Sequence, residues 1–556
     1  MNKNFYWVNE DTRDFMGKGY LEEGTTVEQR VAEVAYQVAC HMDLKSDGKI
    51  PYNTTYTKVF SYIANGYYSL SSPVWSNFGL DRGLPISCNN VTVEDDMDDI
   101  LWKNLEVGRQ TQKGAGTSGY FGKIRPRGSA ISTGGKADGP VHYMSLFETT
   151  TDVISQGSVR RGNFAPYLDA DHPDFLEFME AREGDHFIQK LSLGACLSDD
   201  FMMRCMNMDP KANEILGRIQ KKRDETGYPY IFFTDTVNRN KPAHYKDYTI
   251  LASNLCSEIC QPSTRDESFV CCLLSMNLAT YHEWKDTDAV FIALCILDAV
   301  MEDYIEKIKD DPLMRTSYNS AVKWRAVGVG TLGYHTALQQ LGYSFESPEA
   351  QGFNIAAHEF IWEELNKGTK YLAEILGEPE GLKGTGRRNG TLTAIAPTTS
   401  SSFILGQVSP SIEPLAGNVI TKDLAKGKYG WCNPILQKVL KDVGKDTDEV
   451  WESINENYGS VQHLDFLSEH TKKVFKIFSE IDMNEVVKQA ADRQKFLDQS
   501  QSLNLTFSQD TPVSETIKVL FYAWSLGVKT LYYQRPFQNR AQKLAKELSV
   551  CLACEA

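Results

Sequence analysis

The sequence predicts a mixed α/β fold, and three features of the chain indicate it. Residues 27–42 carry apolar side chains at helical spacing, and Thr25 or Thr26 can cap such a helix. Helix-like and strand-like stretches alternate over residues 169–249. Residues 268–278 form a short apolar run of the kind that is typical of a buried strand. Together these patterns predict a large domain in which strands and helices alternate.

Composition narrows the function classes. The 556 residues are 42% hydrophobic and 24% charged, which is ordinary for a globular protein. The net charge of −15 argues against non-specific binding to nucleic acid, because that binding depends on Lys and Arg. There is no long uncharged apolar run to span a membrane and no apolar core of a signal peptide at the N-terminus. Twelve cysteines without a secretion signal indicate a reducing, cytoplasmic environment.

The central motif is a triplet of polar residues at alternate positions, Asn254, Cys256 and Glu258. In an extended segment, alternate side chains point the same way. One short loop would then present an amide, a thiol and a carboxylate to one small substrate. The alternative is a buried cysteine between two solvated polar residues, since free cysteine is commonly a small apolar core residue.

Further cysteines and a tyrosine pair stand out along the chain, although Cys88 taken alone could be a core thiol at a strand end. Cys88 follows an apolar stretch, and the adjacent Cys271 and Cys272 lie in the predicted strand, where only one of them should point inward. The chain also contains a tyrosine pair, Tyr532 and Tyr533, which in a strand is commonly one core and one surface residue. The tail ends in Cys-x-x-Cys at 551–554, and no second such motif completes a four-cysteine zinc site. A mobile dithiol that exchanges with a disulfide is therefore favoured.

Several segments suit phosphate groups. Residues 387–402 combine an apolar strand with a hydroxyl-rich turn after proline, where backbone amides and hydroxyls at a helix start can bind an anion; a solvated Ser/Thr loop is the alternative. The Gly-rich stretch 114–119 precedes a basic stretch, 123–128, and this combination also suits phosphate. The acidic cluster 94–99 should open a helix. Residues 155–163 form either a mobile loop, whose Arg and Gln side chains could contact the edges of a base, or a basic surface turn.

Two familiar motifs are set aside. Residues 328–333 fit G-x-G-x-x-G, but the preceding residues 319–325 are charged and helical, so the strand–turn–helix context of a dinucleotide site is missing. Glu183 and His186 form the one Glu-x-x-His pair in the chain, whereas a four-helix dimetal site needs two such pairs. We therefore expect no intrinsic dimetal centre and no metal ligands.

Taken in order from about Ser71 to the C-terminus, these motifs resemble the catalytic subunit of ribonucleotide reductase. The segment Asn-Leu-Cys-x-Glu-Ile at 254–259 is similar to that family's finger loop, and residues 271–278 are similar to its Cys-x-Leu-x-Ser-x-Asn-Leu strand. The resemblance implies a ten-stranded α/β barrel of two five-stranded halves, with the finger loop threaded through it. It divides the chain into a helical region, 1–70, without the ATP-sensing domain, a barrel, 71–535, and a flexible redox tail, 536–556.

The resemblance also implies a reaction, the reduction of ribonucleotides to 2′-deoxyribonucleotides by a thiyl radical. Cys256 would carry the radical and abstract the 3′-hydrogen, Glu258 would take the 3′-hydroxyl proton, and Asn254 would hydrogen-bond the sugar. Cys88 and Cys271 would supply the electrons and become a disulfide. In the same resemblance, Tyr532 and Tyr533 would pass an electron and a proton between the radical source and Cys256, acting as relay tyrosines. The tail thiols Cys551 and Cys554 would reduce the disulfide back to two thiols.

Ligand sites and partners are implied in the same way. The expected substrate is a ribonucleoside diphosphate, with a triphosphate as the open alternative, and the expected effector is a dNTP or ATP with Mg²⁺. Substrate binding is assigned to Ser72, Ser87, Thr399, Ser400 and Ser401, and effector binding to Asp95, Arg125 and Arg160. Residues 134–135 and 155–163 resemble the two specificity loops, and residues 328–333 resemble a turn before a barrel helix. Thr399 replaces the family's usual acid.

The chain is expected to hold no cofactor of its own and to receive its radical from a ferritin-like dimetal small subunit. A catalytic homodimer and a thioredoxin- or glutaredoxin-like reductant complete the expected partners. The main alternative is an adenosylcobalamin-dependent, single-subunit reductase, although such an enzyme would not need the tyrosine pair. A glycyl-radical reductase lacks its Arg-x-x-Gly-Tyr signature here. A nucleotide-binding regulator on the same barrel would keep Asp95, Arg125 and the turn but dispense with Cys256.

Overall fold

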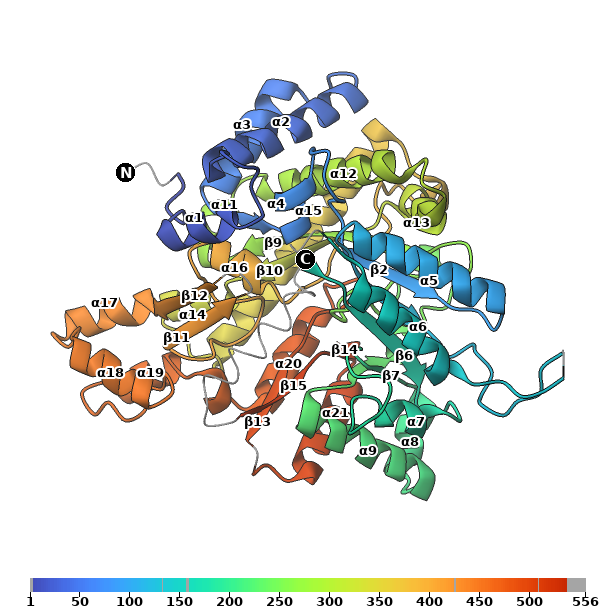
Figure 1. The fold of residues 1–556 in the computed structure, drawn as a ribbon. Coiled ribbons are helices and arrows are strands. Elements are labelled where there is room, and N and C mark those ends of the chain that lie inside the picture. Colours follow the sequence, from blue (N-terminus) through green and yellow to red (C-terminus); the bar gives the residue numbers. More distant parts are fainter. Residues whose placement is uncertain (1–3, 133, 157–159, 425–426, 509, 538–556) are drawn as a thin grey trace.

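The computed structural model describes residues 4–132, 134–156, 160–424, 427–508 and 510–537, without the side chains of 155–161, 422–428 and 536–537. The chain begins with three helices, α1 (Glu10–Gly17), α2 (Val27–Lys45) and α3 (Tyr52–Ala64), which lie together on one side of the barrel (Figure 1). Thr26 caps α2 and forms a reciprocal capping box with Gln29. The predicted helix and its cap are confirmed.

Five parallel strands form the first half of a barrel. In spatial order they are β2 (Cys88–Thr92), β3 (Gly116–Tyr120), β6 (Phe164–Asp169), β7 (Gly194–Leu197) and β8 (Tyr230–Phe233). Helices follow most of these strands and return the chain to the same edge, as parallel pairing requires. The predicted alternation over residues 169–249 is confirmed.

The second half also runs parallel. β9 (Phe269–Asn277) pairs with β10 (Val327–Leu332), and β10 is bridged to an extended segment at residue 393. That segment is bridged from residue 395 to a further segment at residue 501, and the Tyr532 amide beside β14 (Thr530–Leu531) donates to the Leu503 carbonyl at 2.8 Å. These five strands and segments complete the second half.

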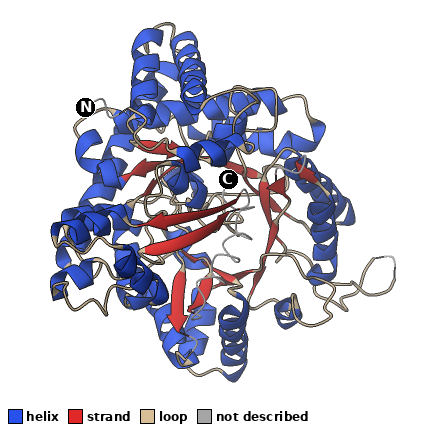
Figure 2. Cartoon of the chain, turned by 60° about the vertical axis from the view of Figure 1, so that its left-hand side comes forward, coloured by secondary structure: helices blue, strands red, loops and turns tan. Residues whose placement is uncertain are grey.

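The two halves meet in antiparallel pairs at both seams. β2 pairs with β9, with Cys88 opposite Cys271, and β14 pairs with β8, with Thr530 opposite Phe232. The ring of strands is therefore closed, with helices outside it (Figure 2). The ten-stranded barrel of two five-stranded halves is confirmed.

The remaining elements cover the barrel or extend from it. β1 (Tyr68–Leu70) pairs with β9, and the outer helices are α4 (Ser72–Asn77), α5 (Met97–Gln112), α6 (Pro140–Val153), α7 (Phe175–Glu180), α8 (Asp199–Met206), α9 (Pro210–Thr226), α10 (Thr234–Arg239), α11 (Tyr281–Trp284), α12 (Ala289–Ile308), α13 (Arg315–Trp324), α14 (Tyr334–Leu341), α15 (Pro348–Leu376), α16 (Thr399–Ile404), α20 (Met483–Gln494) and α21 (Val513–Ser525). The helix α5 begins at the acidic cluster, as predicted, with Asp96 as its N-cap.

A lobe with its own small core projects at the left of Figure 1; it contains β11 (Val419–Leu424), β12 (Gly427–Cys432), α17 (Pro434–Asp442), α18 (Asp448–Glu456) and α19 (Glu469–Val474). None of the described helices is long and apolar enough to cross a bilayer.

One expectation for the G-x-G-x-x-G stretch is wrong. Residues 328–332 are not a turn but part of strand β10. A Cβ on Gly328 would lie 2.5 Å from the Leu273 side chain, and one on Gly330 would lie 2.4 Å from the Ala394 carbonyl oxygen. The two glycines therefore allow close approach of the neighbouring strands, which is a common reason for glycine within a strand.

A buried ion cluster ties the helices to the barrel. The Asp298 carboxylate on α12 is fully buried and accepts hydrogen bonds from Arg325 Nε at 3.1 Å and Arg388 Nε at 3.2 Å. His41 on α2 lies 3.5 Å from its second oxygen. Burial alone would raise the pKa of Asp298, but the two arginines outweigh it and hold the pKa well below its usual 3.8.

We expect Asp298→Asn to lower the free energy of unfolding by about 3 kcal/mol, because it leaves Arg388 without a carboxylate partner and Arg325 with Glu302 alone. Since the folded pKa is depressed, this stabilisation is present at neutral pH and is lost as the pH falls through the lowered value. Urea unfolding at pH 7 measures the effect. Glu306→Gln on the exposed side of the same helix is the control and should behave like the wild type. Equal loss in both variants would contradict the assignment.

Candidate active site

The finger loop, residues 252–260, lies inside the barrel and is buried throughout. Its backbone is held by strands of both halves. The Ser253 carbonyl accepts from Ser118 Oγ at 2.9 Å, and the Asn254 carbonyl accepts from Tyr167 Oη at 2.9 Å. From the other half, Ser502 Oγ donates to the Cys256 carbonyl at 2.6 Å. The loop is therefore fixed between the two halves, as a loop threaded through the barrel must be.

The three motif residues do not lie in an extended segment, and that expectation is wrong. The Ser257 amide donates back to the Asn254 carbonyl at 3.2 Å, and Ser257 has a left-handed φ of 67°. The chain thus turns between Asn254 and Glu258. The turn, rather than strand alternation, places Asn254 near Glu258, and Asn254 lowers the pKa of the Glu258 carboxyl group.

The Glu258 carboxyl group has a pKa shifted towards neutrality. Its carboxylate is buried, accepts from Ser502 Oγ at 3.2 Å and lies 3.9 Å from the Cys88 sulfur. Burial raises its pKa from the usual 4.5 to about 7, while the nearby Asn254, Ser502 and Cys88 side chains oppose that rise. A carboxylate with such a pKa exchanges a proton near neutral pH, which suits a general acid or base.

Cys88 and Cys271 face each other across the seam of the two half-barrels. They are directly opposed residues of the antiparallel pair β2–β9, and both are buried free thiols. Opposed residues of antiparallel strands lie roughly 4.5–5.5 Å apart between Cα atoms, which is within disulfide range. Burial raises the pKa of both thiols. The neighbouring Cys272 points the other way, with its sulfur 3.4 Å from the Leu297 carbonyl oxygen, so the predicted strand parity is confirmed.

The two predicted relay tyrosines are packed against each other. Their ring centroids are 4.3 Å apart; Tyr532 is fully buried and Tyr533 half-buried. Two further tyrosines extend the cluster. Tyr230 lies 4.6 Å from the Tyr532 ring, and the Tyr228 hydroxyl is 3.2 Å from that of Tyr533. The backbone connects this cluster to the finger loop, because the Tyr532 amide bonds the Leu503 carbonyl, next to Ser502.

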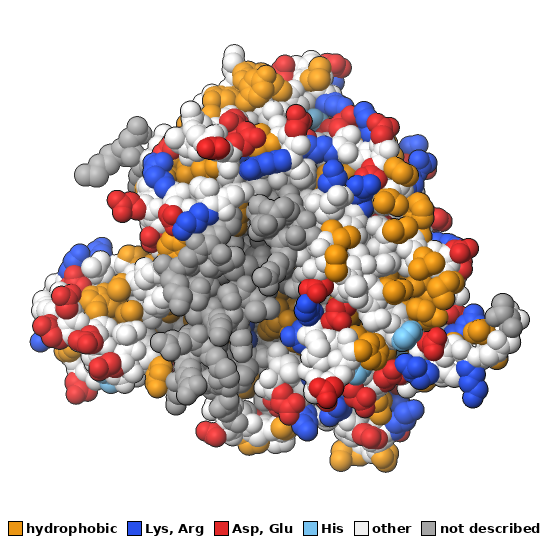
Figure 3. Space-filling view, in the orientation of Figure 1, with side chains coloured by type: hydrophobic (Ala, Val, Ile, Leu, Met, Phe, Trp, Pro, Cys, Tyr) orange, Lys and Arg blue, Asp and Glu red, His pale blue; other side chains and the backbone are white. Residues whose placement is uncertain are grey.

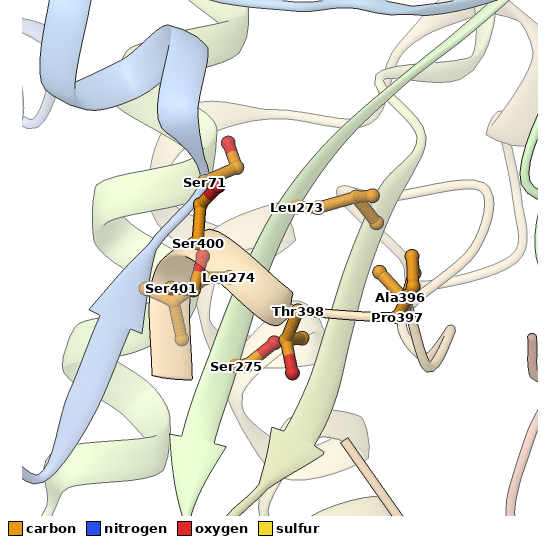
Figure 4. A pocket seen from close by; sticks show the side chains of 9 residues that line it. All are labelled: Ser71, Leu273, Leu274, Ser275, Ala396, Pro397, Thr398, Ser400 and Ser401. Carbon is orange, nitrogen blue, oxygen red and sulfur yellow. The ribbon is translucent and has the colours of Figure 1, made fainter. Parts of the chain in front are cut away.

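A small pocket lies at the hydroxyl-rich turn (Figure 4). It is lined by Ser71, Leu273, Leu274, Ser275, Ala396, Pro397, Thr398, Ser400 and Ser401. The sequence-predicted Ser400 and Ser401 line it, whereas Thr398 takes the place expected of Thr399 and Ser71 that expected of Ser72. Ser72 is buried with its Oγ 3.2 Å from the Tyr20 hydroxyl. Ser87 is buried beside Cys88, and its hydroxyl favours that thiolate.

The predicted effector residues lie outside the barrel core. Asp95 and Arg125 are both partly exposed and form an ion pair, with Arg125 Nε 2.6 Å from an Asp95 oxygen. Arg160 lies in the short strand β5 (Arg160–Arg161), paired with β4 (Ser155–Gln156), and its side chain is outside the described part of the chain. Residues 157–159 of the segment that resembles the second specificity loop also lie outside the described residues.

Two further predictions concern redox and metal groups. Cys551 and Cys554 lie outside the described residues, and so their role stays a prediction. Glu183 is ion-paired with Lys222 at 3.0 Å and with Arg218 at 2.7 Å. Within the described ranges, no group of three or more His, Cys, Asp or Glu side chains is arranged to hold a metal ion.

The structure brings three residues to the site that the motifs did not single out. Ser502 bridges the Cys256 carbonyl and the Glu258 carboxylate, and Gln499 Nε2 lies 3.6 Å from the Cys271 sulfur. Tyr167 supports the loop from the first half-barrel. The signal in the sequence is the run of polar residues at 498–502, since all of these side chains are buried. A buried polar run needs specific partners.

Comparisons with known proteins agree with this architecture. The protein family described as "Ribonucleotide reductase, barrel domain" matches residues 86–210, 205–385 and 379–534. A putative ribonucleoside-diphosphate reductase large subunit of Frog virus 3 is 34% identical over 528 residues, which cover 90% of this chain and 92% of that protein. The ribonucleoside-diphosphate reductase large subunit of Caenorhabditis elegans is 28% identical over 570 residues, covering 88% and 72%. A solved structure, the class Id ribonucleotide reductase alpha subunit of Actinobacillus ureae, has 44% identity and a TM-score of 0.90 over 97% of this chain and 99% of that one.

The raised pKa of Glu258 predicts a pH-dependent stability. A carboxyl group that holds its proton more tightly when folded stabilises the fold fully below its unfolded pKa of about 4.5, and this contribution is lost as the pH rises through about 7. Glu258→Gln removes the ionisation. We therefore expect the free energy of unfolding of the variant to gain roughly 3 kcal/mol relative to the wild type between pH 4.5 and pH 8.

Urea unfolding followed by circular dichroism at several pH values measures this difference. Glu359→Gln, at an exposed position of α15, is the control and should follow the wild type at each pH. A constant offset between Glu258→Gln and the wild type would show that Glu258 titrates normally.

Proposed function

This chain belongs to the ribonucleotide reductase family as a large, catalytic subunit, and we propose that a radical on Cys256 drives its reaction. Its enzyme class is ribonucleoside-diphosphate reductase, an oxidoreductase that supplies 2′-deoxyribonucleotides. The observation that carries the proposed site is the buried loop itself. Inside a closed barrel it presents the Glu258 carboxylate with Asn254 beside it and the Cys88 sulfur 3.9 Å away.

The chemistry begins with the sugar. A ribose 2′-hydroxyl is a poor leaving group, and acid–base catalysis alone does not remove it easily. A thiyl radical on Cys256 abstracts the 3′-hydrogen atom and becomes a thiol, which leaves a carbon radical next to the leaving group. Glu258 takes the 3′-hydroxyl proton, in keeping with its pKa near neutrality, and the Asn254 amide orients the sugar.

Two electrons are then needed, and the facing thiols supply them. The 2′-hydroxyl leaves as water with a proton from one thiol, the other thiol supplies the hydrogen that the 2′-carbon gains, and Cys88 and Cys271 end as a disulfide. Glu258 returns its proton to the 3′-oxygen. The same hydrogen atom returns from Cys256 to the 3′-carbon and regenerates the thiyl radical. The direct opposition of the two cysteines supports this role, because little movement is needed to join them. Cys551 and Cys554 are proposed to reduce the disulfide by thiol exchange, and a thioredoxin- or glutaredoxin-like protein reduces them in turn.

Tyr532 and Tyr533 are proposed to pass the radical to Cys256. Phenol oxidation coupled to proton loss allows a long transfer to proceed in short steps, and rings 4.3 Å apart are suited to one such step. The half-exposed Tyr533 is the end nearer to the surface. The relatives are large subunits, which implies a small-subunit partner; we propose that this partner is ferritin-like, holds the dimetal centre and generates the radical.

Nucleotides are proposed to bind at two places. The hydroxyl-lined pocket with Ser400 and Ser401 suits the diphosphate of the substrate. Asp95 and Arg125, with Arg160, suit a dNTP or ATP effector accompanied by Mg²⁺, since the Arg125–Asp95 pair can open to a phosphate and a sugar. No intrinsic cofactor is proposed for the chain, and its compartment is expected to be the cytoplasm.

A homodimer is proposed through the outer faces of α5 and α6, close to the effector residues. These helices expose several large apolar side chains, and Figure 3 shows hydrophobic side chains gathered on this face. The residues are Met97, Leu101, Trp102 and Leu105 of α5 and Leu146 and Val153 of α6, each between 37% and 75% exposed. An apolar patch of this kind on a soluble domain marks an association surface.

Two other readings fit the chain less well. An adenosylcobalamin-dependent reductase would form its radical within one subunit, whereas this chain keeps a packed tyrosine pair and resembles class I large subunits. A non-catalytic regulator would not need a buried carboxylate of raised pKa next to a pair of opposed thiols.

Replacing the proposed radical-bearing sulfur is the first test. Cys256→Ser, assayed with the purified small subunit, should lose at least about a thousandfold in turnover while nucleotide binding remains, because an alkoxyl radical is not reached under the same driving force. Cys260→Ser is the matched control, since Cys260 is also a buried loop cysteine but has no assigned chemistry, and it should keep most of the turnover. Normal turnover of Cys256→Ser would reject the assignment.

The relay predicts a second loss of activity. Tyr533→Phe removes the oxidisable hydroxyl but keeps the ring, so turnover should fall at least about a hundredfold with substrate binding unchanged. Tyr522→Phe on the nearby helix α21 should retain activity. Steady-state assays with the small subunit measure both variants. If adenosylcobalamin alone restored turnover to either chain, the two-subunit proposal would fail.

A further inference from the structure

A large open cavity lies at the outside of the barrel, apart from the proposed active site. Its volume is about 820 Å³. Three segments contribute most of its wall: the stretch after α10, the loop before residue 391 and the stretch after α20. The lining residues are Asn240, Lys241, Pro242, Ala243, His244, Lys246, Trp362, Lys383, Thr385, Arg387, Lys495, Leu497 and Asp498.

The wall of this cavity is strongly basic, although the chain as a whole carries a net charge of −15. Four lysines and one arginine line it, against the single carboxylate of Asp498. The exposed side chains of Lys246, Lys383 and Lys495 form no ion pair with the described residues. Like charges gathered without counter-charges repel one another, so this arrangement favours a bound anion.

The one carboxylate in the wall is already engaged. Its oxygens accept hydrogen bonds from the Leu392 amide at 2.8 Å and from the Thr393 amide at 3.0 Å. Asp498 therefore holds the start of a barrel strand, and its single negative charge faces four lysines and one arginine.

Arg387 provides the second observation. Its Nη2 is buried and makes no hydrogen bond within the described part of the chain, and the nearest Asp498 oxygen is 3.9 Å away. Leaving a guanidinium donor unpaired is costly unless a ligand or water completes it. The loop that carries it is fixed, because the Gly384 and Gly386 amides both donate to the Glu378 carboxylate. Arg387 and Thr385 are thus held at the cavity wall before any ligand arrives.

The cavity is distinct from the hydroxyl pocket proposed for the substrate. Both are built on the strand segment at residues 391–396, but at opposite ends: Arg387 precedes this segment, whereas Thr398 and Ser400 follow it. Six extended residues span roughly 20 Å. Cys271 packs against Ala394 in the middle of the segment, so the two cavities lie on either side of the thiol pair.

We propose that this cavity is a binding site for a polyphosphate anion, the group found in nucleoside triphosphates and in inorganic tripolyphosphate. Arg387 can offer its Nη2 donors to a phosphate oxygen, because its Nε and Nη1 already donate to Asn389 and Asn366, and flexible lysines can follow a chain of phosphates. The volume is within the range of small-ligand sites. Trp362 in the wall gives a nucleotide a surface for its base. This inference goes beyond the proposed reaction and does not depend on it.

The test compares three full-length proteins by equilibrium dialysis with labelled tripolyphosphate. These are the wild type, a pocket variant with Lys246, Lys383 and Lys495 changed to Gln, and a control with Lys211, Lys438 and Lys473 changed to Gln. All six lysines are exposed, and both variants change the net charge equally. Phosphate sites elsewhere are common to the three proteins and cancel in the comparison.

We expect the pocket variant to lose one equivalent of bound tripolyphosphate per chain, or at least tenfold in affinity at that site, while the control stays within twofold of the wild type. Binding that is equal in all three proteins overturns the proposal, as does an equal loss in both variants, which would reflect net charge alone. If the pocket variant does not fold, a crystal of the wild type soaked in tripolyphosphate decides, and absence of density beside Arg387 overturns the site.

A second arm separates the two sources of the anion. ATP is titrated into the wild type and into Trp362→Phe, with the same pocket variant as reference. Affinity for ATP equal to that for tripolyphosphate identifies the phosphate chain as the ligand. Tighter ATP binding that weakens severalfold in Trp362→Phe identifies a nucleoside triphosphate. Loss of either signal in the pocket variant is required in both cases.

Discussion

A polar loop inside a closed barrel must have every backbone group satisfied, and the rest of this structure follows from that constraint. An unpaired buried amide or carbonyl is costly, and no solvent reaches the finger loop to replace a missing partner. Strands of the first half bind the Ser253 and Asn254 carbonyls, and the segment at 499–502 of the second half binds the Cys256 and Glu258 carbonyls. The loop therefore requires both halves, and the antiparallel seams hold those halves in one register.

The same burial sets the chemistry of the site. Burial raises the pKa of Glu258 to about 7, so this carboxyl group can hold a proton that an exposed one would release at neutral pH. Burial also raises the pKa of the Cys88 and Cys271 thiols, which keeps both protonated. A reactive sulfur radical also needs a place from which other hydrogen donors and water are excluded. The closed barrel supplies that exclusion. It also holds in fixed positions the thiols proposed as the reductant and the residues proposed as the base and the radical carrier.

The sequence predicted the fold class, which the structure confirms, and it named most of the residues that the structure gathers around the finger loop, but for different reasons. Strand parity separates Cys271 from Cys272 with no knowledge of the fold, because adjacent side chains alternate. Parity failed at Asn254–Glu258, since the left-handed Ser257 turns the chain there. Strands at 393–395 and 500–503 are too short to give a periodic signal. Contacts of Ser502 and Gln499 join positions more than 200 residues apart, and no local pattern reports such pairs.

One segment connects the two ends of the barrel. Residues 391–396 pass the thiol pair at Ala394, begin near the basic cavity with Arg387 and end at the hydroxyl-lined pocket. Asp498 holds the start of this segment, and the next residue, Gln499, donates to the Cys271 sulfur. An anion that draws Arg387 away from Asp498 would leave the Asp498 carboxylate without this nearby positive charge. Asp498 directly precedes Gln499, which donates to the Cys271 sulfur. Because the segment is packed closely against Gly328 and Gly330, it has little room to deform locally.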